Sequence, residues 1–141
     1  MASVLVVCHG ELAAALLAST RMIVGSAGTA SALAFAPGTG AEELAEAVDI
    51  AVGDLSRPSG DPSAVLILTD LPGGTPSRVA ATLAATTGAE TVTGVNLPML
   101  AEVLLADPGL SALELAALAY RTGRQGVIDL GAAIRDQEAS S

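Results

Sequence analysis

Short apolar runs alternate along this chain with longer alanine-rich segments of helical periodicity, and few folds accommodate that order. Residues 4–8 (VLVVC) and 64–68 (AVLIL) are apolar throughout, as in strands buried on both faces of a sheet. Weaker strands are expected at residues 30–36 and 91–95, and a short last strand at 126–130. Helices are expected between them, at residues 11–24, 41–55, 77–87, 97–105 and 111–121.

This order, β-α-β-α-β-α-β-α-α-β, predicts an α/β fold with a doubly wound, mostly parallel sheet and helices on both faces. We expect the strand order 2-1-3-4, with the C-terminal strand at an edge. No linker or internal repeat divides the 141 residues, so residues 1–131 are expected to form a single domain. Residues 132–141 become polar and are expected to form a loose tail.

Several helix starts carry capping signals. Thr39 with Glu42, and Ser111 with Glu114, match the capping box, in which a hydroxyl precedes a glutamate by three positions. Asn96 stands before Leu-Pro and is expected to cap the helix at residues 97–105.

Composition excludes several functional classes. The net charge is −9 and lysine is absent, so neither nucleic acid nor an anionic membrane surface is an expected partner. The negative surface either keeps an apolar composition soluble or complements a basic protein partner. No apolar run is long enough to cross a bilayer, and the first residues lack the basic charge of a secretory signal.

The low number of cysteine and histidine residues argues against disulfides and metal sites. A single cysteine, Cys8, excludes an internal disulfide and fits a reducing cytoplasm. With one cysteine and one histidine, His9, no metal site is expected. The P-loop pattern is absent, and we expect no bound cofactor.

Chemistry-bearing residues concentrate at one corner between a strand and a helix, residues 69–76 (TDLPGGTP). A carboxylate, two glycines, a hydroxyl and a helix-starting proline meet there. His9 follows the first strand, and Asp70 follows the third. If the order is 2-1-3-4, both strands end side by side where the strand order reverses, which is where ligands bind in such sheets.

A carboxylate that accepts one imidazole N–H fixes the tautomer and presents the other nitrogen as a nucleophile. Backbone N–H groups of Gly73 and Gly74, the Thr75 hydroxyl and a helix N-terminus would hold an anion beside it. Together these features predict phosphoryl transfer onto His9, with Asp70 as the orienting carboxylate.

Each feature also has a simpler interpretation. His9 can be an ordinary strand-end histidine, Asp70 can cap its own loop, the two glycines can serve only a turn, and Thr75-Pro76 can serve only as a helix start. Cys8 beside His9 suggests a nucleophilic pair, but neighbouring strand residues point to opposite faces, which favours a buried, inert thiol. Arg78 either touches a phosphate or is simply solvated.

Three motifs together resemble the IIA component of the mannose-family sugar phosphotransferase system. They are VVCHGELA at residues 6–13, LTDLPGGTP at 68–76 and TGVNLPML at 93–100, in the order and spacing of that family. The likeness covers nearly the whole chain. The departures are Cys8, where Thr or Ser is common, and the smaller residues near Pro72 and Ser77.

The resemblance implies a cytoplasmic phosphocarrier. The histidine matching His9 would accept a phosphoryl group from HPr and pass it to a IIB component, which serves a IIC/IID permease. Asp70 would orient the histidine, and Thr75 would contact the phosphoryl group. The resemblance also implies a homodimer in which residues 126–130 join the partner's sheet, and the chain is expected to be a free-standing IIA.

Three alternatives remain open at this point. The chain could instead be the phosphotransfer subunit of a dihydroxyacetone kinase, a relative that has the same fold and a matching histidine. A regulatory module could bind a phosphorylated ligand at the corner without turnover. A hydrolase using Cys8 as nucleophile is the third.

Overall fold

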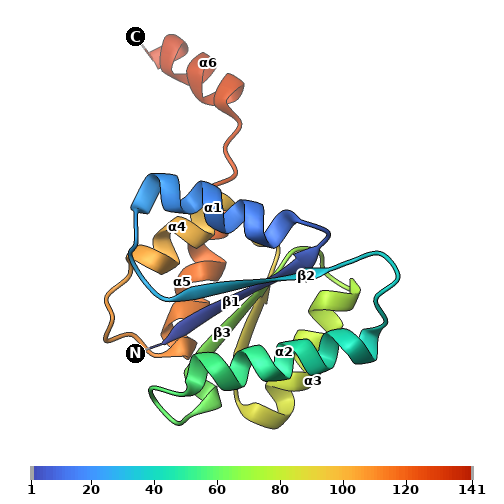
Figure 1. The fold of residues 1–141 in the computed structure, drawn as a ribbon. Coiled ribbons are helices and arrows are strands. Elements are labelled where there is room, and N and C mark those ends of the chain that lie inside the picture. Colours follow the sequence, from blue (N-terminus) through green and yellow to red (C-terminus); the bar gives the residue numbers. More distant parts are fainter. Residues whose placement is uncertain (1, 141) are drawn as a thin grey trace.

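The protein is an α/β sandwich built on a four-stranded parallel sheet (Figure 1). The computed structural model describes residues 2–140. The strand order is β2-β1-β3-β4, which confirms the predicted order of the first four strands. The strands are β1 (Ser3–His9), β2 (Ala30–Phe35), β3 (Val65–Thr69) and β4 (Glu90–Thr93).

Helices cover both faces of the sheet, as the alternation predicts. Helices α1, α4 and α5 lie on one face, and α2 and α3 lie on the other (Figure 1). Their bounds are α1 (Leu12–Val24), α2 (Ala41–Ser56), α3 (Thr75–Thr87), α4 (Leu97–Leu105) and α5 (Ala112–Gln125), with a short 3-10 turn η1 (Pro62–Ala64) before β3.

The two central strands supply both halves of the core. In β1, Val4, Val6 and Cys8 pack towards α1, α4 and α5, whereas Leu5 and Val7 pack towards α2 and α3. The five residues of β3 are all buried. Alternate side chains of a strand point to opposite faces, so a strand covered on both faces is apolar along most of its length. This requirement explains why the runs at residues 4–8 and 64–68 carry the clearest sequence signal.

Two of the three expected helix caps form, and one does not. Ser111 and Glu114 form the expected capping box, and the Asn96 side chain accepts the Met99 N–H at 3.0 Å. The capping box expected at Thr39 and Glu42 is wrong, because α2 begins after Gly40 and its N-cap makes no side-chain hydrogen bond. The Thr39 N–H instead donates to the Ala36 carbonyl in the preceding turn.

The expected C-terminal edge strand at residues 126–130 is not formed within residues 2–140. Helix α5 runs to Gln125, and a new helix, α6 (Leu130–Ser140), stands away from the domain (Figure 1). A strand needs a hydrogen-bonding neighbour, and this segment reaches no strand of its own sheet. Residues 132–140 of the expected loose tail belong to α6, none of whose residues is buried. Met1 and Ser141 lie outside the described residues.

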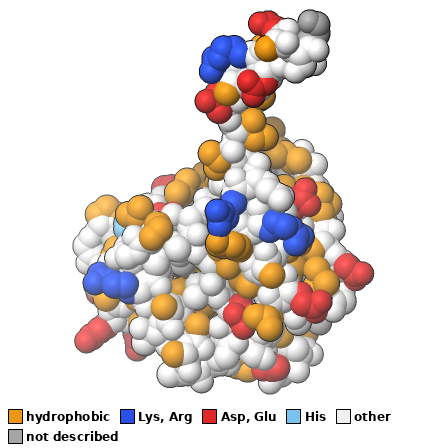
Figure 2. Space-filling model, turned by 180° about the vertical axis from the view of Figure 1, so that it is seen from behind, with side chains coloured by type: hydrophobic (Ala, Val, Ile, Leu, Met, Phe, Trp, Pro, Cys, Tyr) orange, Lys and Arg blue, Asp and Glu red, His pale blue; other side chains and the backbone are white. Residues whose placement is uncertain are grey.

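Apolar side chains remain exposed around this segment. They gather where α6 joins the domain (Figure 2). They belong to Val127, Ile128, Leu130 and Ile134, which are between 55% and 78% exposed.

Replacing Gly126 by alanine tests the packing of α4 against the end of α5, and the same change at Gly53 in α2 is the control. A Cβ added at Gly126 would lie 2.4 Å from Cβ of Pro98, whose ring cannot turn aside, whereas a Cβ at Gly53 meets nothing within 4 Å. We expect Gly126→Ala to lower the free energy of unfolding by about 1–3 kcal/mol through overpacking. Gly53→Ala, in the interior of α2, should raise it by about 0.5–1 kcal/mol. Urea unfolding followed by circular dichroism measures both, and equal effects of the two substitutions would contradict this packing.

Candidate active site

The fold brings His9 and Asp70 together at the carboxyl edge of the sheet. Strands β1 and β3 are hydrogen-bonded neighbours, with Val7 opposite Thr69, so the residues that follow meet across the pair. His9 Nδ1 lies 3.0 Å from Asp70 Oδ2 and 3.2 Å from Oδ1, and the His9 backbone N–H donates to Oδ2 at 2.9 Å. Residues 61 positions apart thus form one polar pair, as expected from the strand order.

The carboxylate of Asp70 controls the state of the imidazole. Burial by itself would raise the Asp70 pKa, but the hydrogen bonds from the His9 backbone and ring outweigh it and hold the pKa below its ordinary 3.8. An ionised carboxylate only accepts hydrogen bonds, so the neutral ring carries its proton on Nδ1. The lone pair is then on Nε2, which has no hydrogen-bond partner among residues 2–140.

The imidazole is held in place while its edge stays open. The His9 side chain is 45% exposed, whereas that of Asp70 is 13% exposed. Phe35, the last residue of β2, stands edge-on to the imidazole with ring centroids 5.6 Å apart. This contact supports one side of the ring, and nearly half of the His9 side chain stays open to solvent.

A tight turn delivers the glycines of residues 69–76 to the histidine. The Gly74 N–H donates to the Leu71 carbonyl at 3.0 Å, with Pro72 and Gly73 between them. Gly73 has φ +77°, which a turn of this kind requires at its third position and which glycine adopts without strain. The turn brings Gly74 so close to the ring that an added Cβ would lie 3.0 Å from His9 Cε1.

Ser77 fastens this turn to the sheet. Its hydroxyl donates to the Leu71 carbonyl at 2.6 Å and lies 2.8 Å from Thr69 Oγ1 and 2.9 Å from Thr93 Oγ1. One hydroxyl has one donor and two acceptor positions, so Ser77 is fully satisfied when both threonines donate to it. The ends of β3 and β4 and the turn after Asp70 are therefore held by one side chain.

The anion-binding groups differ in one respect from the expectation. The Gly74 N–H is already committed to Leu71, whereas the Gly73 and Thr75 N–H groups donate to no partner within residues 2–140. Gly74 is the N-cap of α3, so Thr75 is its first residue rather than its cap, and Pro76 follows in the first turn. The positive end of the α3 dipole still faces this corner.

Cys8 does not take part in the site chemistry. Its side chain is fully buried among the residues that face α1, α4 and α5. Burial, and secondarily the charge of Asp70, raises the pKa of the thiol to about 12. A thiol of this pKa is protonated at neutral pH and is a poor nucleophile, which argues against the cysteine hydrolase.

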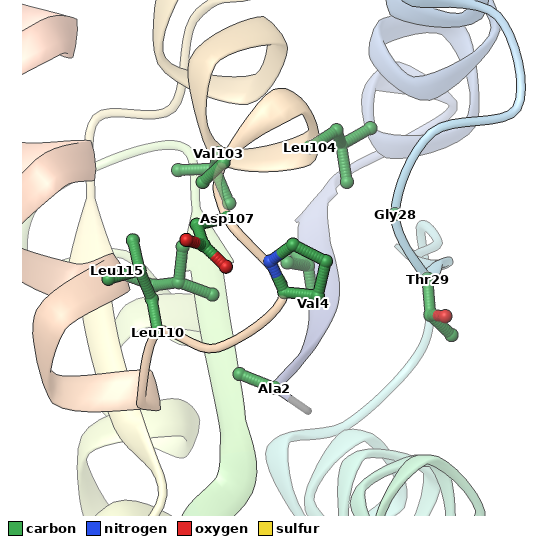
Figure 3. A pocket seen from close by; sticks show the side chains of 11 residues that line it. Ala2, Val4, Gly28, Thr29, Val103, Leu104, Asp107, Leu110 and Leu115 are labelled. Atoms are coloured by element: carbon green, nitrogen blue, oxygen red, sulfur yellow. The ribbon is translucent and has the colours of Figure 1, made fainter.

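Several hollows lie outside the histidine pair, one of them of about 290 Å³ between Thr93, Met99 and Tyr120. A groove of about 470 Å³ runs between α2 and α3 and begins at Thr75 and Arg78. A smaller cavity of about 260 Å³ lies beside the first residues of β1, between Val4, Gly28, Leu104 and Leu115 (Figure 3). That cavity shares no residue with the site, because it lies at the amino edge of the sheet.

Neither a metal site nor a membrane span is found in the part of the chain that the structure describes. No three His, Cys, Asp or Glu side chains cluster there in a way that could hold a metal ion. No helix between residues 2 and 140 has the length and apolar character needed to cross a bilayer.

Sequence reasoning paired His9 with Asp70, as the structure does, and missed the residues that support them. Phe35, Ser77 and Thr93 were not expected to contribute, although Phe35 contacts His9, Ser77 bonds the turn, and Thr93 bonds Ser77. Ser77 had a weak signal, a small hydroxyl residue in the first turn of a helix after the glycines. Phe35 had a stronger one, because it is the last residue of the strand next to β1.

Two N-cap glycines of matching backbone conformation offer a test of the close approach to His9. Gly74 (φ −70°, ψ 165°) and Gly40 (φ −81°, ψ 163°) begin α3 and α2, but an added Cβ at Gly40 meets nothing within 4 Å. We expect Gly74→Ala to shift the imidazole NMR signals of His9, the chain's single histidine, and Gly40→Ala to leave them unchanged. Unchanged signals in both variants would contradict the contact.

The lowered pKa of Asp70 predicts how stability depends on pH. The contribution of its interactions is fully present above the unfolded-state value of about 3.8, and it is lost as pH falls through the lower folded-state pKa. We expect Asp70→Asn to cost about 1–3 kcal/mol of unfolding free energy at pH 6, and less as pH drops below 4. Urea unfolding at several pH values measures this, with Asp49→Asn on the exposed face of α2 as control. A difference that grows on acidification would contradict the assignment.

Comparison with known proteins places these features in a family. The family model described as "PTS system fructose IIA component" matches residues 3–119. The chain is 38% identical over 121 residues to the mannose-specific EIIAB component of Escherichia coli K12, a match covering 84% of this chain and 36% of that protein. It therefore spans about a third of that relative's length. It is 37% identical over 105 residues to the fructose-specific EIIA component of Bacillus subtilis, covering 74% and 69% of the two chains.

A solved structure gives the same assignment. The mannose/sorbose-specific IIA subunit from Enterococcus faecalis superposes with a TM-score of 0.81 at 30% identity, covering 90% of this chain and 92% of that one. The chain thus belongs to the mannose-family EIIA components of the sugar phosphotransferase system.

Proposed function

We propose that this protein is a phosphocarrier whose His9 Nε2 accepts a phosphoryl group from phospho-HPr and passes it to a IIB component. The observation that carries the proposal is a half-exposed imidazole whose Nδ1 is held by Asp70 at 3.0 Å, which leaves Nε2 without a hydrogen-bond partner among residues 2–140. A merely structural histidine has no need of an unbonded nitrogen beside a helix N-terminus.

The proposed transfer conserves protons at His9. The Nε2 lone pair attacks the phosphorus, an N–P bond forms, and the N–P bond to the donor imidazole of HPr breaks. The Nδ1 proton stays in its hydrogen bond to Asp70, whose negative charge stabilises the positive ring that forms. Transfer to IIB is the same displacement with IIB as acceptor. The phosphoryl group arrives on a protein, so this step calls for no cofactor.

The corner after β3 supplies the proposed phosphoryl site. The Gly73 and Thr75 N–H groups and the Thr75 hydroxyl would donate to the phosphoryl oxygens, aided by the α3 dipole. Gly74 contributes by its missing side chain, because a Cβ there would press against His9 Cε1. The site residues are then His9 and Asp70 for the chemistry, and Gly73, Gly74 and Thr75 for the phosphoryl group.

The proposed partners follow from this role. HPr is the donor, IIB the acceptor, and a IIC/IID permease receives the group indirectly, which places the protein in the cytoplasm. We also propose a homodimer in which residues 126–130 pair with a partner's sheet. The exposed Val127, Ile128 and Leu130 support it, since burying them against a second copy would remove apolar surface from water.

Phosphotransfer from phosphoenolpyruvate through enzyme I and HPr tests the proposal, with intact mass as readout. We expect wild type to gain one acid-labile phosphoryl group and His9→Gln to gain none. Asp70→Ala should gain it about 10²–10⁴-fold more slowly, because the tautomer is no longer held. Circular dichroism of both variants confirms that they fold.

Two results would contradict the proposal. Failure of wild type to gain mass with an active HPr is one. The other is a tight, non-covalent complex with phosphate or a phosphorylated partner, which would favour the regulatory module. If the phosphorylated protein passes its phosphoryl group to a dihydroxyacetone kinase and not to a IIB component, the protein is the phosphotransfer subunit of that kinase.

A further inference from the structure

Arg78 stands at the phosphoryl corner without an ion-pair partner among residues 2–140. It lies in the first turn of α3, and its Nη2 donates to Thr75 Oγ1 at 3.3 Å. Thr75 follows Gly74, where an added Cβ would lie 3.0 Å from His9 Cε1. Arg78 is thus hydrogen-bonded to the residue next to the glycine that approaches the imidazole.

Positive charge is scarce in this protein, so its placement carries information. The chain has no lysine and six Lys or Arg residues in all, and basic side chains are few on the face shown in Figure 2. Arg21 is bound to backbone carbonyls at the end of α1, and Arg57 pairs with Asp54 at the end of α2. Arg78 alone among the arginines of the described chain donates to a residue of the 69–76 corner.

The hydrogen bond from Arg78 directs the Thr75 hydroxyl. A threonine oxygen has two lone pairs and one hydrogen, so accepting from Arg78 leaves the hydrogen free to donate. A cationic donor on the oxygen also polarises the O–H and strengthens the bond it makes to an anion.

The charge of Arg78 matters most after transfer. A phosphoryl group adds roughly −1.5 to −2 charges beside the ionised Asp70, in a protein whose net charge is already −9. The guanidinium bonded to Thr75 strengthens the donation of the Thr75 hydroxyl to that added charge, so the effect of Arg78 reaches the phosphoryl group through Thr75.

We propose that Arg78 is a positioning residue for phosphoryl transfer, acting through the Thr75 hydroxyl. This rests on the proposed phosphocarrier function. Arg78 then contributes to the transfer rate only when the Thr75 hydroxyl can donate. Thr75 contacts the phosphoryl group, and Arg78 sets the direction and strength of that contact.

A double-mutant cycle tests the inference. The rate of phosphorylation by phospho-HPr is measured for Arg78→Met in the wild-type and Thr75→Val backgrounds, with Arg78→Lys as the charge-conserving variant. Arg57→Met is the matched control, because Arg57 is an exposed arginine at the opposite edge of the sheet. Thermal melting shows that the variants fold.

We expect Arg78→Met to slow phosphorylation about five- to tenfold, and Arg57→Met less than twofold. Arg78→Lys should recover part of the loss. In the Thr75→Val background, Arg78→Met should change the rate less than twofold.

The outcomes separate this inference from the function on which it rests. If wild type is phosphorylated and Arg78→Met matches Arg57→Met, the inference is overturned and the phosphocarrier function stands. If Arg78→Met loses the same factor with and without the Thr75 hydroxyl, positioning through Thr75 is overturned. If wild type itself gains no phosphoryl group, the proposed function has failed first.

Discussion

The parallel pairing of β1 with β3 is the constraint on which the site depends. These strands lie in the middle of the sheet and are buried on both faces, so their register is set by the packing of every side chain they carry. His9 and Asp70 are the first polar residues beyond that register on each strand. A one-residue slip would turn His9 to the other face and separate it from the carboxylate.

The turn after Asp70 and the hydrogen bonds of Ser77 hold the structure around that pair in place. The turn after Asp70 needs Gly73 for its positive φ and Gly74 for its lack of a side chain beside His9. Ser77 then ties the turn back to the ends of β3 and β4. A relaxed turn would carry Thr75 and the start of α3 away from the imidazole, so these supports belong to the chemistry as much as to stability.

Sequence reasoning succeeded for strands whose burial requires a continuous apolar run. It failed where the groups of a local motif make other hydrogen bonds. The strands at residues 4–8 and 64–68 were readable because both of their faces are covered. The box at Thr39 failed because a preceding turn uses the Thr39 N–H, and Gly74 was misjudged as a free donor because its N–H closes a turn. The strand at 126–130 had β-like residues but no neighbour in its own sheet.

By itself, the sequence determined the alternation of strands and helices, the turn chemistry at residues 71–74 and which residues could react. Those properties follow from side-chain periodicity and local backbone preference, which act over a few residues. Only the tertiary structure decided that His9 meets Asp70 through Nδ1, that Phe35 and Ser77 support them, and that Cys8 is sealed away. Contacts between residues tens of positions apart arise from how the layers pack, and no local pattern records the distance between two side chains.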